Sequence, residues 1–144
     1  LPRGAPATVA DLHDLERKVR YAMSFHGARY IHILVPCPLG WGAPSAKTIE
    51  LARLAHETGL FPVFEAEYGE VTNVSKIRRK QPVEKYLMLQ KRFAHLFGKK
   101  GNPEIVQRMQ ALADRNIARY GLLGDEQGDD IPVPEQAEER HHVI

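Results

Sequence analysis

The segment 30–42 constrains the fold more than any other part of the chain. It begins with strand-forming residues, 30–35, and then reaches the turn Pro36-Cys37-Pro38, after which Trp41 stands between two glycines. The prolines restrict the backbone on both sides of Cys37, and Pro38 has no N–H to donate. This pattern predicts a buried strand that ends in a rigid turn, at the end of the strand where open α/β sheets keep their binding sites.

Helix and strand patterns alternate around this segment. Apolar residues three or four positions apart predict a helix over 9–25, with Thr8 as its N-cap and Gly27 after its end. Before this helix, prolines at positions 2 and 6 predict a loop over 1–7. The helix and the strand that follows it fit the closing half of a parallel βαβ unit.

A second helix and a hairpin are predicted after the turn. Ser45 is in place to cap a helix over 46–58, which Gly59 ends. Two short strands, 60–66 and 71–74, flank a turn at Tyr68-Gly69. Because Pro62 lacks a donor, we expect the first of these strands to lie near a sheet edge.

The sequence changes character after residue 75. Lys and Arg dominate 76–100, and amphipathic helices are predicted over 82–97 and 103–120. Pro82 opens the first of them, while Asn102 caps the second and Gly121 ends it, so the pair forms a helical hairpin. The acidic segment 122–144 has no periodicity, which predicts an extended or disordered tail that contacts a partner.

Length and composition limit the number of domains. A chain of 144 residues with 43% hydrophobic residues is long enough for one core. No apolar run reaches the roughly 20 residues of a membrane span and no secretory signal opens the chain, so we expect a soluble, cytoplasmic protein without membrane contact. Because Leu1 stands where a methionine would begin a complete chain, we expect a piece of a longer polypeptide.

Cys37 is the only cysteine of the sequence, so it cannot form an internal disulfide. A lone cysteine is commonly a small buried hydrophobic residue, and this interpretation stays open. The rigid turn instead favours a thiolate with a chemical role, as a nucleophile or a metal ligand. The sequence has no recognisable histidine and acid pair for a nucleophile and no C-x-x-C for a metal, so further ligands would come from elsewhere.

Several segments together resemble a known family. They are the turn 36–42, the run 47–65 with its Glu57-Thr58-Gly59-Leu60-Phe61-Pro62 element, Pro82-Val83-Glu84-Lys85-Tyr86-Leu87, and Gln90-Lys91-Arg92-Phe93. Within 11–97, this set resembles the C-terminal part of the thiamine-diphosphate-binding beta subunit of the 2-oxoacid:ferredoxin oxidoreductases, the pyruvate synthase family. The joined Pro-Cys-Pro-x-Gly-Trp and Glu-Thr-Gly-x-x-Pro elements are the specific part of the match.

The resemblance implies an enzyme subunit that is not active alone. Family members oxidatively decarboxylate a 2-oxoacid with coenzyme A to an acyl-CoA and carbon dioxide. They use thiamine diphosphate with magnesium, and electrons leave through 4Fe-4S clusters to ferredoxin or another acceptor. One cluster of the beta subunit is held by cysteines, and Cys37 matches the one in the Pro-Cys-Pro turn. The resemblance places the other ligands and the thiamine motif before Leu1.

The resemblance also implies the partners and the organisation of the chain. The alpha subunit and the N-terminal part of the same beta subunit are the expected partners. Residues 1–74 would form the C-terminal part of a thiamine-diphosphate-binding α/β domain with a mainly parallel sheet. Residues 75–121 would form a basic linker and the helical hairpin, and 122–144 the tail.

Other candidate residues receive structural interpretations. His32 fits a satisfied or edge-facing strand histidine. Trp41 fits an anchor in the core or an interface, with its glycines letting the backbone approach a bulky neighbour such as a cluster. His141-His142 fits the tail without a metal role. Glu65, Glu67 and Glu70 fit an alternating edge strand.

Two other classes of function remain as alternatives. The first alternative is a nucleic-acid-binding module that uses the basic region 76–100. Its basic residues Lys76, Arg78, Arg79 and Lys80 could meet nucleic acid or the phosphates of coenzyme A, but no aromatic residues are interleaved with these four, and a solvated or intersubunit face is the favoured interpretation. The second alternative is a purely structural interaction subunit, in which Cys37 is an ordinary thiol.

Overall fold

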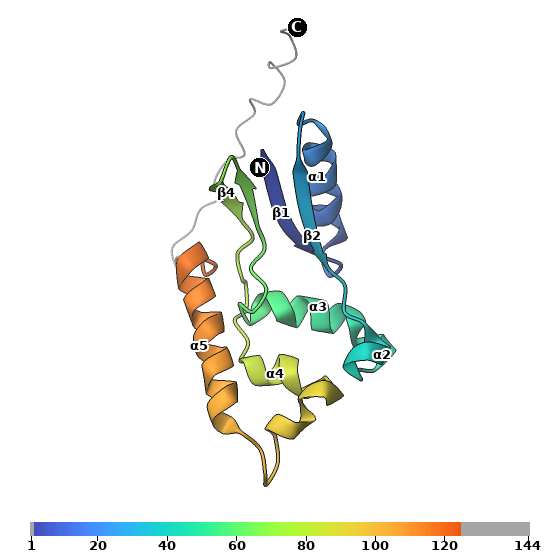
Figure 1. The fold of residues 1–144 in the computed structure, drawn as a ribbon, viewed down its shortest axis with the longest axis vertical. Helices are drawn as coiled ribbons and strands as arrows, with labels where there is room; N and C mark the ends of the chain where they lie inside the picture. Colours follow the sequence, from blue (N-terminus) through green and yellow to red (C-terminus); the bar gives the residue numbers. More distant parts are fainter. Residues whose placement is uncertain (1, 125–144) are drawn as a thin grey trace, which may run out of the picture.

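The computed structural model describes residues 2–124 as a mixed α/β fold (Figure 1). The strands are β1 (Arg3–Thr8), β2 (Arg29–Leu34), β3 (Phe64–Glu67) and β4 (Glu70–Val74). The α-helices are α1 (Leu12–Met23), α2 (Pro38–Trp41), α3 (Thr48–Glu57), α4 (Val83–Met88) and α5 (Pro103–Tyr120), and the short 3-10 helices are η1 (Ser45–Lys47) and η2 (Lys91–Leu96). His141-His142 and most of the predicted tail lie outside the described residues.

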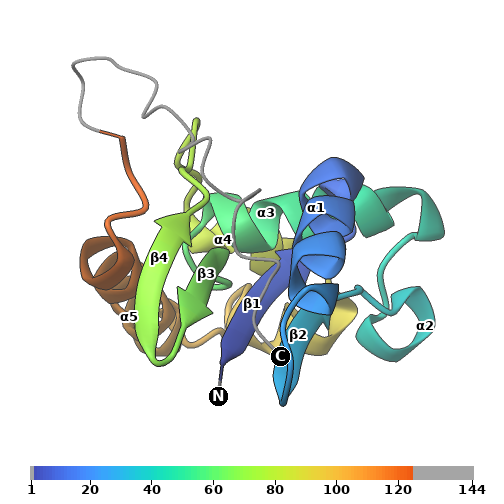
Figure 2. The same cartoon turned by 90° about the horizontal axis from the view of Figure 1, so that it is seen from above.

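The strands within 2–124 form one mixed sheet in the order β2-β1-β3-β4. β1 and β2 run parallel, with Arg3 opposite Arg29 and Thr8 opposite Leu34. β3 runs antiparallel to both β1 and β4. The α/β class is confirmed, but a mainly parallel sheet is not, because the β3–β4 hairpin adds antiparallel pairs beside the single parallel pair in the described part of the chain. Figure 2 shows α1 along β1 and β2, with α5 beyond β4.

The loop predicted over 1–7 is wrong, because Arg3–Thr8 forms strand β1 in the interior of the sheet. Local signals favour a loop there, since prolines cannot donate to a strand ladder. β1 pairs with β3 only at Arg3 and Gly4, so Pro6 lies beyond that pairing. Pairing with distant strands therefore overrides the local preference of this segment.

The strand predicted over 60–66 starts later and does not lie at an edge. β3 begins at Phe64, after Pro62, and lies between β1 and β4. The turn at Tyr68-Gly69 is confirmed, with both residues at positive φ (51° and 96°), and β4 returns from it as predicted.

The first helix is present but shorter than predicted. Its N-cap is Asp11, whose Oδ1 accepts a hydrogen bond from the Asp14 N–H at 2.9 Å, whereas Thr8 ends β1. Its C-cap is Ser24 rather than Gly27. Val9 and Ala10 form a turn after β1, so the helix begins later than predicted and Asp11 caps it.

The other predicted caps are partly confirmed. α3 follows η1 without a side-chain cap, so Ser45 does not have its predicted role. α5 begins and ends as predicted, because the Asn102 side chain accepts from the Ile105 N–H at 3.2 Å and Gly121 adopts φ 58°. No helix in the part of the chain that the structure describes has both the length and the apolar character needed to cross a bilayer.

The helix predicted over 82–97 is divided into α4 and η2. Gln90 is extended (φ −124°, ψ 114°), and its N–H bonds to the Leu87 carbonyl. In a continuous helix the Tyr86 carbonyl would accept from the Gln90 N–H. Here the buried Gln90 side-chain amide donates to that carbonyl at 2.6 Å instead. The side chain thus replaces a backbone bond and ends the helix.

The main hydrophobic core lies between α3, α4, η2 and α5. It consists of Leu51, Leu54, Ala55, Val83, Tyr86, Leu87, Leu96, Val106 and Ala113. Because α3 precedes residue 75 and the other helices follow it, this core joins the two parts that the sequence divided at 74/75. The division itself stays a prediction.

A smaller cluster closes the far end of α5. Ile77, Ile117 and Leu122 are buried together, and the Ile77 N–H donates to the Leu122 carbonyl at 2.7 Å. The segment predicted as a tail from residue 122 therefore begins with a core residue.

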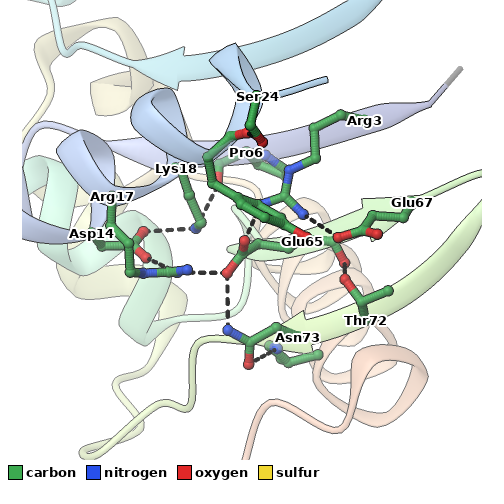
Figure 3. Close-up of polar contacts among 12 residues, drawn as sticks. Arg3, Pro6, Asp14, Arg17, Lys18, Ser24, Glu65, Glu67, Thr72 and Asn73 are labelled. Carbon is green, nitrogen blue, oxygen red and sulfur yellow. Dashed lines mark hydrogen bonds and ion pairs between the residues drawn. The ribbon is translucent and has the colours of Figure 1, made fainter. Parts of the chain in front are cut away.

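A buried ionic network holds the sheet to α1 (Figure 3). The Glu65 carboxylate of β3 accepts hydrogen bonds from Arg3 of β1, from Arg17 of α1 at 2.5 Å and from Asn73 of β4 at 2.9 Å. Burial alone raises the pKa of Glu65, but these donors outweigh burial and lower the pKa to about 2. One carboxylate thus connects four elements.

Lys18 extends this network on α1. It is fully buried, and its ammonium group pairs with Asp14 at 2.6 Å and donates to the Pro6 carbonyl of β1 at 3.0 Å. Asp14 also accepts from Arg17 at 2.9 Å. The charges on α1 therefore fix the position of the helix over the strand.

We expect Glu65→Gln to lower the free energy of unfolding by about 3 kcal/mol at pH 7, because it removes the carboxylate shared by Arg3 and Arg17 and leaves the buried Arg3 with only its longer pair to Glu67. The pKa of Glu65 is about 2 in the fold against an ordinary 4.5, so its contribution is complete above pH 4.5 and lost as the pH falls through 2. Urea unfolding should therefore show the gap between wild type and variant closing over this range.

Glu16→Gln is the control, because Glu16 forms an exposed pair with Arg20. It should change the free energy of unfolding by less than about 0.5 kcal/mol. A gap between wild type and Glu65→Gln that stays constant from pH 7 to pH 2 would contradict this assignment.

Gly59 lies where α3 meets α5, and a side chain there would not fit. At φ +81°, an added Cβ would lie 2.6 Å from Ile117 Cγ1 and 2.9 Å from the Ala113 carbonyl oxygen. Gly59→Ala should therefore lower the free energy of unfolding by about 2 kcal/mol. Gly69→Ala shares the positive φ but meets nothing within 4 Å, so it should cost less. If urea unfolding gave the same loss of unfolding free energy for Gly59→Ala and Gly69→Ala, the close packing at Gly59 would not explain the cost of its substitution.

Candidate functional site

The turn that carries Cys37 follows β2 directly (Figure 1). β2 ends at Leu34, whose carbonyl accepts from the Val9 N–H at 3.2 Å, so the end of this strand is tied to the segment that follows β1. Pro36 is buried, and α2 begins at Pro38. Cys37 thus lies at the carboxyl end of the parallel strand pair, where the sequence predicted it. The prediction that this strand is buried is wrong in the described residues, because β2 is an edge strand whose residues are mostly exposed.

Cys37 is exposed rather than buried. It is the N-cap residue of α2, with φ −98° and ψ 106°, and its Sγ accepts a hydrogen bond from the Gly40 N–H at 3.4 Å. The interpretation of Cys37 as a small buried hydrophobic residue is therefore wrong in this structure. The thiol has a defined orientation and is open to a group from outside the described residues.

The described residues offer no complete metal site around Cys37. Within residues 2–124, no group of three or more His, Cys, Asp or Glu side chains is arranged to hold a metal ion. A cluster that is held by several thiolates would therefore take only one of them from this part of the chain. Gly40 lies next to the sulfur, where an added Cβ would only make ordinary contact with Cys37 Sγ at 3.4 Å.

Trp41 anchors the turn on the helical core, as its structural interpretation predicted. It is half-buried and packs against the main hydrophobic cluster. The Arg92 guanidinium lies 4.0 Å from the centre of its ring system. Gly42 lies against Lys91, whose Cβ would be 2.7 Å from a Cβ at this glycine. Within the chain, the bulky neighbour that Gly42 accommodates is Lys91.

Basic side chains of 76–100 make contacts within the chain. Lys76 donates to the Gly121 carbonyl at 2.7 Å, and Lys80 pairs with Asp114 at 2.7 Å. This hydrogen bond from Lys80 lowers the pKa of Asp114. These contacts attach the basic segment to α5, and the nucleic-acid alternative gains no support from them.

The acidic residues of β3 and β4 do not form an alternating edge strand. Glu65 is buried in the network described above, Glu67 pairs with Arg3 at 3.2 Å, and Glu70 is exposed. The position of Lys18 in the sequence is a signal for this network. Lys18 stands three residues after Leu15 and four before Ala22, on the face of α1 that apolar spacing assigns to the interior.

His32 occupies an edge of the described sheet, in agreement with its interpretation as an edge-facing residue. It is exposed on β2, and its ring meets the Phe61 ring edge-on at a centroid distance of 5.3 Å.

A hollow of about 520 Å³ lies beside the end of β1, and Cys37 is not part of its lining. His56 lies in its wall, and burial lowers the pKa of this histidine. Asp11, Asp14, Glu57, Arg53, Lys76 and Arg78 also line it. The mixture of both signs of charge favours neither an anionic nor a cationic ligand.

Comparison with known proteins identifies relatives that carry names. The chain is 46% identical over 121 residues to the pyruvate synthase subunit PorB of Methanosarcina barkeri, covering 84% of this chain and 41% of that protein. It is 41% identical over 122 residues to PorB of Methanocaldococcus jannaschii, covering 85% and 39%. It is 39% identical over 110 residues to the ketoisovalerate oxidoreductase subunit VorB of Pyrococcus abyssi, covering 75% and 35%. No protein-family model matches the chain.

These relatives agree with the resemblance that the Pro-Cys-Pro turn and its neighbouring segments carry. The chain spans about two fifths of the length of the PorB proteins it matches. On this similarity, the chain belongs to the family of the beta subunits of the 2-oxoacid:ferredoxin oxidoreductases.

Proposed function

We propose that this chain is part of the beta subunit of a 2-oxoacid oxidoreductase that converts a 2-oxoacid and coenzyme A into an acyl-CoA and carbon dioxide. The electron pair released would pass from thiamine diphosphate through a 4Fe-4S cluster to ferredoxin or another acceptor. In this proposal Cys37 is one ligand of the cluster, and residues outside this chain hold the thiamine and its magnesium ion.

Two kinds of observation support the proposal. The named relatives are subunits of pyruvate synthase and ketoisovalerate oxidoreductase, and both names refer to 2-oxoacids. The observation that carries the role of Cys37 is its exposure on a turn with restricted backbone, beside Gly40. A ligand that must meet thiolates from other loops needs this accessibility.

The chain contributes a positioned thiolate to this reaction. A 4Fe-4S cluster, when bound, would supply electron transfer between the thiamine and the acceptor. Cys37 would hold the cluster at the end of β2, and the Gly40 N–H, which donates to Sγ, would stabilise negative charge on the sulfur. Hydrogen bonds to cluster sulfurs are one of the factors that set reduction potentials.

The edge of the sheet supports a partner beside β2. In the described sheet β2 is an edge strand. It carries two large apolar side chains that are exposed, Tyr30 (56%) and Ile33 (40%). On the neighbouring helix α1, Leu12 and Met23 are 67% and 69% exposed. Exposed apolar side chains on a strand edge are typical of interaction surfaces. We propose that the N-terminal part of the same beta subunit covers this face and that the alpha subunit completes the complex.

The proposal places the complex in the cytoplasm. Reducing conditions there keep thiols free of disulfides, so an exposed cysteine such as Cys37 stays available as a ligand.

We expect Cys37→Ala to remove a 4Fe-4S cluster from the assembled complex while the fold of this chain is retained. Because Cys37 is exposed, the substitution should change the free energy of unfolding by less than about 0.5 kcal/mol. Iron and sulfide content and the EPR spectrum of the reduced complex measure the loss, and circular dichroism checks the fold.

Ser45→Ala is the matched control, because this exposed residue begins η1, shortly after the turn, and its side chain does not cap a helix. Its iron content should equal that of the wild type. Wild-type iron content and EPR signal in the Cys37→Ala complex would refute the ligand role.

A further inference from the structure

Arg92 forms the outer layer of a stack on the turn that carries Cys37. Its guanidinium lies 4.0 Å from the centre of the Trp41 ring system and 4.7 Å from the centre of the Phe93 ring. Trp41 also packs against the main hydrophobic core. A planar guanidinium on an aromatic face is held both by charge and by stacking, so Arg92 restrains the tryptophan from outside.

Arg92 is itself held in place from the core. Its Nε donates to Gln90 Oε1 at 2.9 Å, and the Gln90 amide donates in turn to the Tyr86 carbonyl at 2.6 Å. Gln90 is only 1% exposed, so this link is rigid compared with an ordinary surface contact. The break between α4 and η2, which the periodicity did not predict, is what aims Arg92 at Trp41.

The backbone next to the stack adds a second attachment. The Lys91 N–H donates to the Gly42 carbonyl at 3.2 Å, and Gly42 adopts φ +63° against the Lys91 side chain. α2 is a single short turn between Cys37 and Gly42. A helix this short is not stable alone, so its geometry depends on the contacts at its end.

We propose that Arg92 is a positioning residue for Cys37. By stacking on Trp41, Arg92 fixes the turn that carries the cysteine. This inference rests on the proposed function, in which Cys37 holds a cluster. Arg92 does not touch the sulfur in this structure; it acts through Trp41 and the single turn of α2. The segment Gln90–Phe93 therefore belongs to the cluster site, although it lies more than fifty residues after Cys37 in the sequence.

The test compares Arg92→Lys and Arg92→Gln in the assembled complex. Lysine keeps the charge but loses the planar stack, so both variants should behave alike. We expect normal iron content after anaerobic purification, an altered EPR line shape, and loss of the cluster to an iron chelator about fivefold faster than in wild type, equivalent to about 1 kcal/mol. Arg20→Gln, which removes an exposed guanidinium from α1, should match wild type.

A separate measurement keeps this inference distinct from the ligand role. After removal of the cluster, the rate at which iodoacetamide alkylates Cys37 reports how firmly the turn is held. This rate should rise about fivefold in both Arg92 variants. If the Cys37→Ala complex retains all its iron, Cys37 is not a ligand. The alkylation assay would then still show whether Arg92 restrains the turn, because it measures the free thiol of Cys37.

Three outcomes would overturn the role of Arg92. The first is a wild-type alkylation rate in both variants. The second is a wild-type EPR line shape and chelation rate in both variants while Cys37→Ala loses the cluster. The third is normal behaviour of Arg92→Lys with only Arg92→Gln affected, which would assign the effect to charge instead of stacking.

Discussion

The buried Glu65 carboxylate is the interaction on which the arrangement of the sheet depends. Arg3, Arg17 and Asn73 donate to it from β1, α1 and β4, so a single acceptor fixes three elements relative to β3. Removing the Glu65 carboxylate would leave the buried Arg3 with only its longer pair to Glu67, which costs more than an exposed surface pair contributes. The network therefore helps to fix β3 next to β1, where only Arg3 and Gly4 pair with β3 in the backbone ladder.

The position of Cys37 follows from this arrangement. β1 pairs in register with β2 over its whole length, so fixing β1 also fixes where β2 ends. On the other side, the helical core holds Trp41, and Gln90 aims Arg92 at it. The turn is thus attached at its start by the sheet and at its end by the helices. Neither attachment alone would orient a single turn of helix.

The sequence predicted elements whose signals are local. Apolar spacing and the Asn102 and Gly121 caps identified α5, and Tyr68-Gly69 identified the hairpin. It failed where a distant contact decides the structure. β1 is a strand only because β2 and β3 pair with it, and α4 ends because one buried side chain takes a backbone acceptor. For the site, the Pro-Cys-Pro pattern and its resemblance singled out Cys37, whereas Arg92 is recognisable only once α4 and η2 are placed.

A lone thiol on a fixed turn is a reasonable solution for a ligand shared between separate parts of a complex. Thiolates from different segments must converge on one cluster, and each flexible segment would lose conformational entropy on binding. Two prolines, a single helical turn and a stacked arginine remove most of that freedom at Cys37 before any cluster is present. In the proposed function, the exposed apolar edge at β2 has a similar explanation, because both features would meet groups that residues outside this chain supply. The contacts that hold the turn lie entirely within this chain. In the proposed complex, the Cys37 sulfur could therefore be positioned before the other ligands and subunits bind.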